Sequence, residues 1–325
     1  MKVINKAYFK KWWKIIVATF MGFIDDNGLK LSASLAYYTM FSIAPFLILV
    51  ISVVGLFFKH DAATNAIYPQ IVHYVGVQAA TQIQDILKNL AFSGKSFTAL
   101  IISIVTLLIG ASSTFVEIQD SLNIIWRVKA KPKKGWLKLI QNRFLSFSLI
   151  VSLAFLLLAS LVVNLIITGL STDLEHFLPL ITGFLFKAIN LGITFTVITV
   201  LFAIIFKFLP DVKIHWRDVR AGALFTAAFF MIGQYGINVY IEYTARSSAY
   251  GAAGSILAVL VWIYYTSAIL YIGAEFTQVY AEAIGTKIEP AEYAVFVQQT
   301  EVEKEVVTLP AQNPQIKGNL KEEVK

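Results

Sequence analysis

Long runs of apolar residues dominate the chain and recur six times. They extend over Leu31–Phe58, Phe97–Ile118, Phe144–Gly169, Leu180–Phe208, Val219–Tyr243 and Gly254–Tyr280. A helix needs about 20 mostly apolar residues to cross a hydrocarbon core of roughly 30 Å, and every run is long enough. In hydrocarbon, each backbone N–H and C=O must bond within the protein, which favours helices. The pattern therefore predicts an all-α integral membrane protein with six transmembrane helices.

Positive charge alternates between the gaps that separate these runs. Lys and Arg residues gather before Leu31, within Trp126–Arg143, around Lys207–Arg220 and after Thr286, whereas the remaining gaps hold few of them. Cytoplasmic loops of membrane proteins retain an excess of Lys and Arg. We therefore predict a multi-pass protein with both chain ends in the cytoplasm.

Composition supports a membrane protein and narrows the chemistry. Of the 325 residues, 57% are apolar and 14% are charged, which lies outside the range of soluble domains. The formal net charge of +7 is concentrated in loops beside the predicted spans, where anionic headgroups attract basic residues, so no nucleic-acid partner is expected. The chain contains no cysteine, which excludes disulfides and thiolate chemistry.

We expect three regions along the chain. Residues 1–30 form an N-terminal cytoplasmic or interfacial region, residues 31–285 the six-helix transmembrane domain, and residues 286–325 a disordered cytoplasmic tail rich in Glu, Lys, Gln and Pro. Within the first region, Tyr8–Ile24 predicts an amphipathic helix, because its aromatic and apolar residues recur at helical spacing. The gap Lys59–Ser96 predicts two short external amphipathic helices.

Polar residues interrupt the apolar runs at spacings of three and four. Examples are Tyr38 in the first run, which also contains Pro45, Asn123 just beyond the second run and Asn238 in the fifth. Such spacing puts each set on one side of its helix, and that side is costly to expose to lipid. Polar faces of this kind either hold membrane helices together or line a polar pathway, and the sequence leaves both readings open.

Ionisable residues within or beside the runs fall into two predicted layers. The outer layer combines Lys187, Glu242 and Arg246 with Asn238. The inner layer, at the cytoplasmic ends of the helices, holds Glu117, Asp120 and Glu275, with Lys207, Arg127 or Arg143 as candidate counter-ions. Charges near a bilayer centre cost about 2.5–3.5 kcal/mol each on insertion scales, so these residues are candidates for a substrate pathway.

The loop Trp126–Arg143 is the most basic part of the chain. Its first cations are candidates for contact with anionic lipid headgroups: Arg127, Lys129, Lys131, Lys133 and Lys134. The same charges also serve as a topology signal that needs no ligand.

Motifs for catalysis and for cofactors are not found in the sequence. The four histidines have no zinc-ligand spacing, and neither a nucleophile elbow nor a phosphate-binding glycine loop occurs. We therefore predict a protein that is not an enzyme and that uses no metal or cofactor. One catalytic alternative is a nuclease in which Glu117, Asp120 and Glu275 hold a metal ion, although their spacing is not specific.

Four segments in order resemble the YihY / virulence factor BrkB family, and the resemblance runs from about Asp25 to Ala283. They are Ser34–Pro45 (SLAYYTMFSIAP), Thr114–Trp126 (TFVEIQDSLNIIW), Phe206–Asp211 (FKFLPD) and Tyr250–Glu275 (YGAAGSILAVLVWIYYTSAILYIGAE). The resemblance implies a six-span protein of the bacterial inner membrane with a role in lipid or envelope-precursor export; the older family label, ribonuclease BN, is regarded as mistaken. The matching motif positions are Tyr37, Tyr38, Pro45, Glu117, Asp120, Asn123, Trp126, Pro210, Trp262 and Glu275.

The leading hypothesis is a protein that transports or accommodates a lipidic or amphipathic envelope substrate through a polar cavity in the bundle. The alternative is a membrane scaffold for envelope machinery that acts through a protein partner or as a homo-oligomer. The nuclease described above is the third reading.

Overall fold

The computed structural model describes residues 6–55, 81, 113–131, 179–246, 252–298 and 307. The predicted external helices and third apolar run, most of the second run, and the end of the tail lie outside this part of the chain. Within it, helices dominate, and four of the six predicted runs are long helices. The count of six spans stays a prediction.

The N-terminal half begins with two helices joined by a tight turn. α1 covers Lys6–Asp25 and α2 covers Gly28–Gly55. Between them, Asn27 has φ 57, a left-handed conformation that Asn tolerates better than most residues. The next described segment, residues 113–125, is helical and ends before a short strand, β1, at Val128–Ala130.

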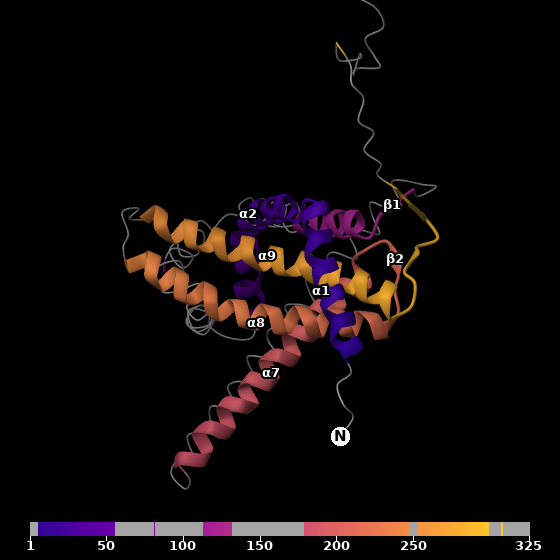
Figure 1. Ribbon diagram of the computed structural model, residues 1–325. Coiled ribbons are helices and arrows are strands. Elements are labelled where there is room, and N and C mark those ends of the chain that lie inside the picture. Colours follow the sequence, from indigo (N-terminus) through magenta and orange to yellow (C-terminus); the bar gives the residue numbers. More distant parts are fainter. Residues whose placement is uncertain are drawn as a thin grey trace, which may run out of the picture.

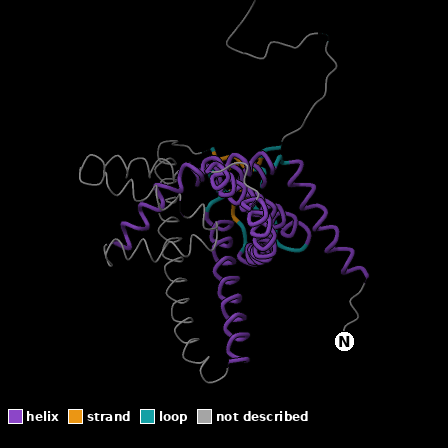
Figure 2. Tube along the Cα trace, turned by 90° about the vertical axis from the view of Figure 1, so that its left-hand side faces the viewer, coloured by secondary structure: helices purple, strands orange, loops and turns teal. Residues whose placement is uncertain are grey.

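Three long helices follow. α7 covers Pro179–Phe208, α8 Trp216–Arg246 and α9 Ala252–Ala283, with the short strand β2 at Val212–Lys213 between α7 and α8. In Figure 1, α8 and α9 run side by side, while α7 extends away from the body of the molecule; Figure 2 shows the same departure from another side.

Two of the described helices contain windows long and apolar enough to cross a membrane. They are Ala188–Phe208, of which 17% is buried, and Val259–Ala283, of which 61% is buried. An apolar helix with as little burial as the first window has a surface suited to lipid, whereas the second window lies mostly inside the bundle. The first window lies within the predicted span Leu180–Phe208, and the second overlaps the predicted span Gly254–Tyr280 and extends three residues beyond it.

α8 and α9 approach closely through paired glycines and threonines. A side chain at Gly222 would meet Thr277, and one at Gly273 would meet Thr226. Each threonine hydroxyl in turn donates to a carbonyl one turn earlier in its own helix, Thr226 to Gly222 and Thr277 to Gly273, both at 2.7 Å. Small residues that let helix backbones approach are typical of membrane bundles.

α1 packs against α9, and in Figure 1 it crosses that helix. Trp12 stacks on Phe276 with ring centroids 6.5 Å apart and lies 6.2 Å from Tyr280. Of the predicted apolar face, Phe23 is buried, whereas Phe9 and Trp13 are exposed. The helix is therefore confirmed, but its apolar residues divide between a protein contact and an outer surface.

The region after α9 is more ordered than the sequence predicts. β3 at Glu289–Pro290 pairs antiparallel with β2, and β4 at Ala294–Phe296 pairs antiparallel with β1. The expectation of disorder from residue 286 is therefore wrong for these strands, because they complete backbone hydrogen bonds of the earlier loops. The fold is thus helical with two small two-stranded sheets added at one end.

Asp218 fixes the start of this segment to α8. The carboxylate is fully buried in the first turn of the helix, and Oδ2 accepts hydrogen bonds from the Thr286 hydroxyl and from Thr286 N, the latter at 3.1 Å. A carboxylate at this position also interacts favourably with the helix N-terminus. The connection holds the end of α9 beside the start of α8.

The core lies at the same end of the bundle as the two sheets. It is built from large side chains of residues 113–128, α7, α8 and α9, among them Leu122, Trp126, Phe206 and Tyr271. Trp126 Nε1 donates to the Ala274 carbonyl at 3.1 Å, which satisfies the indole inside this apolar cluster. This end, called below the Arg127 end, holds the candidate site.

Candidate functional site

Three segments distant in sequence bring charged residues together at the Arg127 end. Arg127 Nη2 donates to Asp26 Oδ1 in the α1–α2 turn at 3.0 Å. The Asp26 side chain is in turn hydrogen-bonded to Glu275 of α9. Arg127 has φ 54, a left-handed backbone conformation of the kind that often ends a helix, and it directly follows the helix of residues 113–125 and Trp126. We call Asp26 and Glu275 the carboxyl pair, and Arg127 is the arginine bonded to it.

Glu275 is the most enclosed member of this group. The residue is 3% exposed, and Oε1 has no hydrogen-bond partner within the described part of the chain. Its other oxygen lies against Gly22 of α1, where a Cβ would stand only 2.7 Å from Oε2. The glycine therefore lets α1 approach closely enough to cover the carboxyl group.

The electrostatics of Asp26 reflect this enclosure. Burial raises the pKa of the Asp26 carboxyl above its ordinary value and is the largest effect. The charge of Arg127 and the hydrogen bond with Glu275 act in the opposite direction, and the charge of Asp25 adds to the rise. A buried carboxyl beside a second carboxyl favours the protonated form of one of them.

A second polar group joins two sequence motifs. Asp211 is 2% exposed and accepts hydrogen bonds from Asn123 Nδ2 at 2.9 Å and from Gln119 Nε2 at 3.2 Å. Asn123 was selected from the sequence as a pathway residue, but here its side chain holds the loop after α7. The sequence does not single out Asp211 and Gln119 as site residues. The one indication of their importance is that they lie inside two of the four family motifs.

The three inner carboxyls do not form one cluster. Partial burial raises the pKa of the Asp120 carboxyl above its ordinary value, and the nearby negative charges of Glu117 and Asp211 raise it further. Glu275 belongs instead to the carboxyl pair. In the described residues, no group of three or more His, Asp or Glu side chains could hold a metal ion. The proposed metal-holding set is therefore not assembled.

The candidate counter-ions also have separate roles. Arg127 reaches the Glu275 group through Asp26, as expected for one of the suggested cations. Lys207 instead donates to the Ile214 carbonyl at 2.5 Å and lies 5.7 Å from the centre of the Trp216 ring. Arg143 lies outside the described residues.

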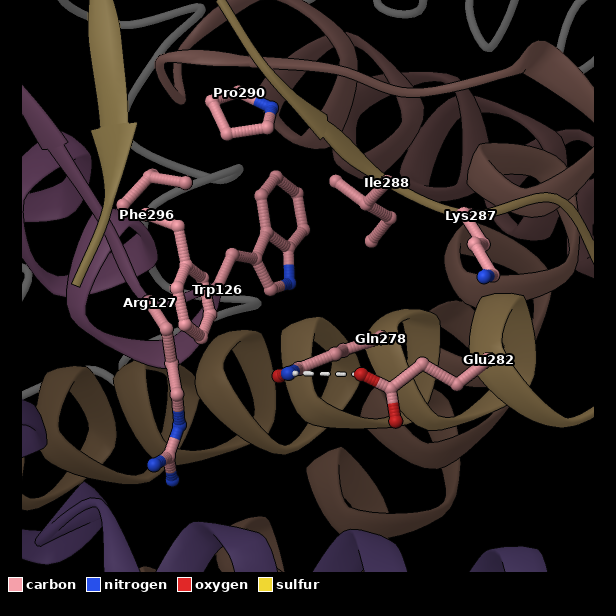
Figure 3. Close-up of a pocket in the computed structure, with 9 residues that line it drawn as sticks. Trp126, Arg127, Gln278, Glu282, Lys287, Ile288, Pro290 and Phe296 are labelled. Atoms are coloured by element: carbon pink, nitrogen blue, oxygen red, sulfur yellow. Dashed lines mark hydrogen bonds between the residues drawn. The ribbon is translucent and has the colours of Figure 1, made fainter. Parts of the chain in front are cut away.

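A pocket of about 620 Å³ opens beside Arg127, and we call it the Arg127 pocket (Figure 3). Its polar lining consists of Arg127, Lys287, Glu282 and Gln278. The facing wall is apolar and includes Trp126, Ile288 and Phe296. In Figure 3 the Arg127 side chain runs from this pocket toward the indigo helices, so the same residue connects the pocket with the carboxyl pair.

Four of the nine residues that line the pocket come from the segment after α9, in which the sequence predicts no site. Lys287, Ile288 and Phe296 belong to the region that was expected to be disordered. The β-branched and aromatic residues around Val295 were the available signal, because such residues favour strands. Strand β4 places Phe296 opposite Val128 and thereby forms one side of the pocket.

The remaining predicted site residues are only partly described. Tyr38 is 39% exposed and meets the Tyr37 ring edge-on at 5.8 Å, so it lies on an outer surface of α2. Lys129 and Lys131 are exposed at the Arg127 end. Several predicted site residues have side chains outside the described part of the chain, and the outer layer therefore stays a prediction: Lys187, Glu242, Arg246, Asn238, Pro45, Lys133 and Lys134.

Comparison with known proteins identifies a family and several relatives. The family model described as Virulence factor BrkB matches residues 19–295, which extends the match beyond Ala283 and into the strands after α9. A UPF0761 membrane protein of Alteromonas mediterranea is 25% identical over 267 residues, covering 81% of this chain and 86% of the relative. Another, from Pseudoalteromonas translucida, is 25% identical and covers 78% of this chain and 81% of the relative. No solved structure matches.

Proposed function

This chain belongs to the virulence factor BrkB family, and we propose that it moves an amphipathic envelope lipid whose anionic headgroup binds in the Arg127 pocket. The relatives are membrane proteins. The proposal includes the topology expected from the charge pattern: a bacterial inner membrane, both chain ends in the cytoplasm and the pocket on the cytoplasmic side.

The observation that carries this proposal is the division of the pocket into a charged side and an apolar side. Arg127 and Lys287 supply positive charge, and Trp126 with Phe296 supplies the apolar wall. Guanidinium and ammonium groups form strong hydrogen bonds with phosphate oxygens, while apolar side chains suit the first carbons of an acyl chain. A volume of about 620 Å³ falls within the range of small-molecule sites.

Polar groups inside the bundle support a path beyond the pocket. The Ser42 and Thr114 hydroxyls are 2.8 Å apart across two segments. Deeper along α9, Trp262 Nε1 and Tyr265 Oη are buried without a hydrogen-bond partner among the described residues. Such groups are costly in hydrocarbon and would bond polar atoms of a passing headgroup. Exposed Lys129 and Lys131 would concentrate anionic lipid near the entrance.

The proposal is tested with purified protein in phosphatidylcholine vesicles that contain tail-labelled fluorescent phosphatidylglycerol. We expect lipid movement between leaflets, and we expect Lys287→Gln to slow it about tenfold or more, because a hydrogen bond to a charged group contributes about 1.5–3 kcal/mol. The matched control is Lys30→Gln, which removes the same charge from an exposed position in the first turn of α2, outside the pocket lining.

Two results would contradict the proposal in different ways. Equal rates for the wild type and Lys287→Gln would show that the pocket does not hold the headgroup. Vesicles in which the wild type moves neither labelled phosphatidylglycerol nor labelled phosphatidylcholine would reject lipid movement altogether. A scaffold role would then be the remaining reading, since the metal site that a nuclease needs is not assembled among the described residues.

A further inference from the structure

The carboxyl pair leaves more negative charge in the bundle than its arginine can neutralise. If Asp26 and Glu275 are both ionised, two negative charges face the single positive charge of Arg127. Asp25 is the other charged group that acts on both carboxyls, and it adds further repulsion. Burying an unpaired charge is expensive, and two carboxyls in contact avoid the cost by sharing one proton.

The geometry supplies a place for that proton. Glu275 is 3% exposed, with its Oε1 unpartnered among the described residues and its Oε2 pressed against Gly22. Among the described residues, this carboxyl therefore has no hydrogen-bond donor that would stabilise its ionised form, apart from its contact with Asp26. A neutral carboxylic acid needs fewer such donors than a carboxylate does.

Arg127 connects this proton to the pocket. Its guanidinium is bonded to Asp26 at 3.0 Å, and the same residue lines the pocket next to Lys287 and Glu282. With the pair fully ionised, the pair and Arg127 together carry a charge of about −1; with one shared proton they are neutral, and with two they carry about +1. An anion in the pocket is therefore attracted more strongly when the pair holds more protons.

We propose that the Asp26–Glu275 pair is a proton-binding site and that an anionic headgroup in the Arg127 pocket takes up a proton from solution onto this pair. The proton ends on a carboxylate oxygen of the pair, and no other bond changes. This inference rests on the proposed function for the pocket as the anion site. By linkage, headgroup binding then weakens as the pH rises, and proton binding strengthens when the headgroup is present.

The test measures binding of a water-soluble short-chain phosphatidylglycerol to the full-length protein in detergent, by calorimetry across the neutral pH range. Repeating the titration in buffers of different ionisation heat counts the protons taken up. For the wild type, we expect uptake of up to about one proton and an affinity that falls by up to about tenfold per pH unit over the titrating range.

Two variants remove the proton site independently. Glu275→Gln and Asp26→Asn replace a carboxyl with a neutral group of similar shape, so each should keep binding at high pH and abolish proton uptake. The control is Glu289→Gln, an exposed carboxyl on β3 that is not part of the pocket lining, which should keep the wild-type pH dependence. Because Asp26 lies in a turn and Glu275 inside a helix, one variant tests the idea if the other fails to fold.

The outcomes separate this inference from the function of the pocket. Phosphatidylglycerol binding with the same proton uptake in wild type, Glu275→Gln and Asp26→Asn would overturn the proton site while leaving the pocket in place. Absence of binding by the folded wild type at every pH would overturn both. Infrared spectra give a second readout: a band from a protonated carboxyl should be present in the wild type and missing from Glu275→Gln.

Discussion

Asn123 and Asp211 exchange hydrogen bonds in both directions. Asn123 Nδ2 donates to Asp211 Oδ2 at 2.9 Å, and Asp211 N donates to Asn123 Oδ1 at 2.9 Å. The two residues are 88 positions apart and both are buried. A single asparagine thus satisfies a carboxylate and a backbone amide in the loop that follows α7, which fixes this loop against residues 113–125.

Replacing Asn123 with alanine should destabilise the protein. Asp211 would keep its bond from Gln119 but lose a donor to its carboxylate and an acceptor for its amide. A buried polar group left unpaired costs about 1–3 kcal/mol, and a charged group costs more. Thermal unfolding in detergent should show a clearly lower midpoint for Asn123→Ala. The control, Asn190→Ala on the exposed surface of α7, should change it little, and equal effects of both substitutions would contradict this account.

Gly222 should not accept a side chain. A Cβ at this position would stand 1.8 Å from Thr277 Oγ1 and 2.8 Å from Thr277 Cβ, so α8 and α9 would have to separate. Overpacking of this kind costs typically about 1–3 kcal/mol. Gly192→Ala is the matched control. Gly192 also lies in a helix, and no atom lies within 4 Å of the Cβ that the substitution would add. The thermal midpoint should fall for Gly222→Ala and hold or rise for Gly192→Ala.

Trp12 and Trp13 are neighbours in sequence but should differ in energetic importance. Trp12 contacts the rings of Phe276 and Tyr280, whereas Trp13 is 60% exposed. Aromatic pairs contribute about 0.5–1.5 kcal/mol each beyond burial, so Trp12→Ala should cost roughly 1–3 kcal/mol and Trp13→Ala much less. Proteolysis within α1 should also speed up only for Trp12→Ala. Because the chain lacks cysteine, a single cysteine placed in α1 would report the same loosening by labelling rate.

Asp120 should make stability depend on pH. Partial burial of its carboxyl, and then the charges of Glu117 and Asp211, raise its pKa above the ordinary 3.8. The folded protein therefore binds the Asp120 proton more tightly than the unfolded chain, and this contribution, fully present below pH 3.8, is lost as the pH rises through the raised value. Since the residue is exposed overall, solvent screening limits the size of the effect.

Asp120→Asn should consequently raise the thermal midpoint at neutral pH and converge with the wild type in acid. The control is Glu292→Gln, which removes a negative charge from a residue whose side chain is 85% exposed and which pairs with Lys213 at 3.0 Å. That variant should leave the pH profile unchanged. A lower midpoint for Asp120→Asn at neutral pH would mean that its charge has an unrecognised favourable partner.

The sequence predicts the long helices well because their signal is local. The apolar runs at Leu180–Phe208 and Gly254–Tyr280 lie within α7 and α9, since twenty or more apolar residues are read directly from the chain. The same logic found the amphipathic helix α1, extended by two residues at its start and one at its end relative to Tyr8–Ile24.

The candidate site was predicted less well because it depends on pairing between distant residues. Glu275 was recognised as a buried charge, but its contact with Asp26 depends on a turn 249 positions away in sequence, which no local pattern reports. Conversely, Tyr38 shares its helical spacing with buried residues but faces outward. The strands after α9 were missed because a two- or three-residue strand has too little periodicity to stand out within a polar tail.

Those strands give a final prediction about the C-terminal segment. Ending the chain after residue 288 removes both strand pairs and, in addition, three backbone hydrogen bonds outside the strand ladders: Ala291 N to the Asp211 carbonyl at 3.0 Å, Val297 N to the Arg127 carbonyl at 2.8 Å and Lys131 N to the Tyr293 carbonyl at 2.7 Å. At about 0.5–1.5 kcal/mol each, their loss implies roughly 1.5–4.5 kcal/mol of destabilisation.

The matched control ends the chain after residue 298, which retains both strand pairs and the whole lining of the Arg127 pocket. Thermal unfolding and phosphatidylglycerol binding should be close to those of the full chain in this control and reduced in the shorter one, which lacks Phe296 and Pro290 from the pocket wall. If both truncations behave alike, the segment from 289 to 298 contributes nothing to the site. If only the shorter chain loses stability and binding, residues 289–298 are part of the pocket, although their composition is that of a tail. The physical reason is that their backbone bonds to that of Arg127 and covers this residue.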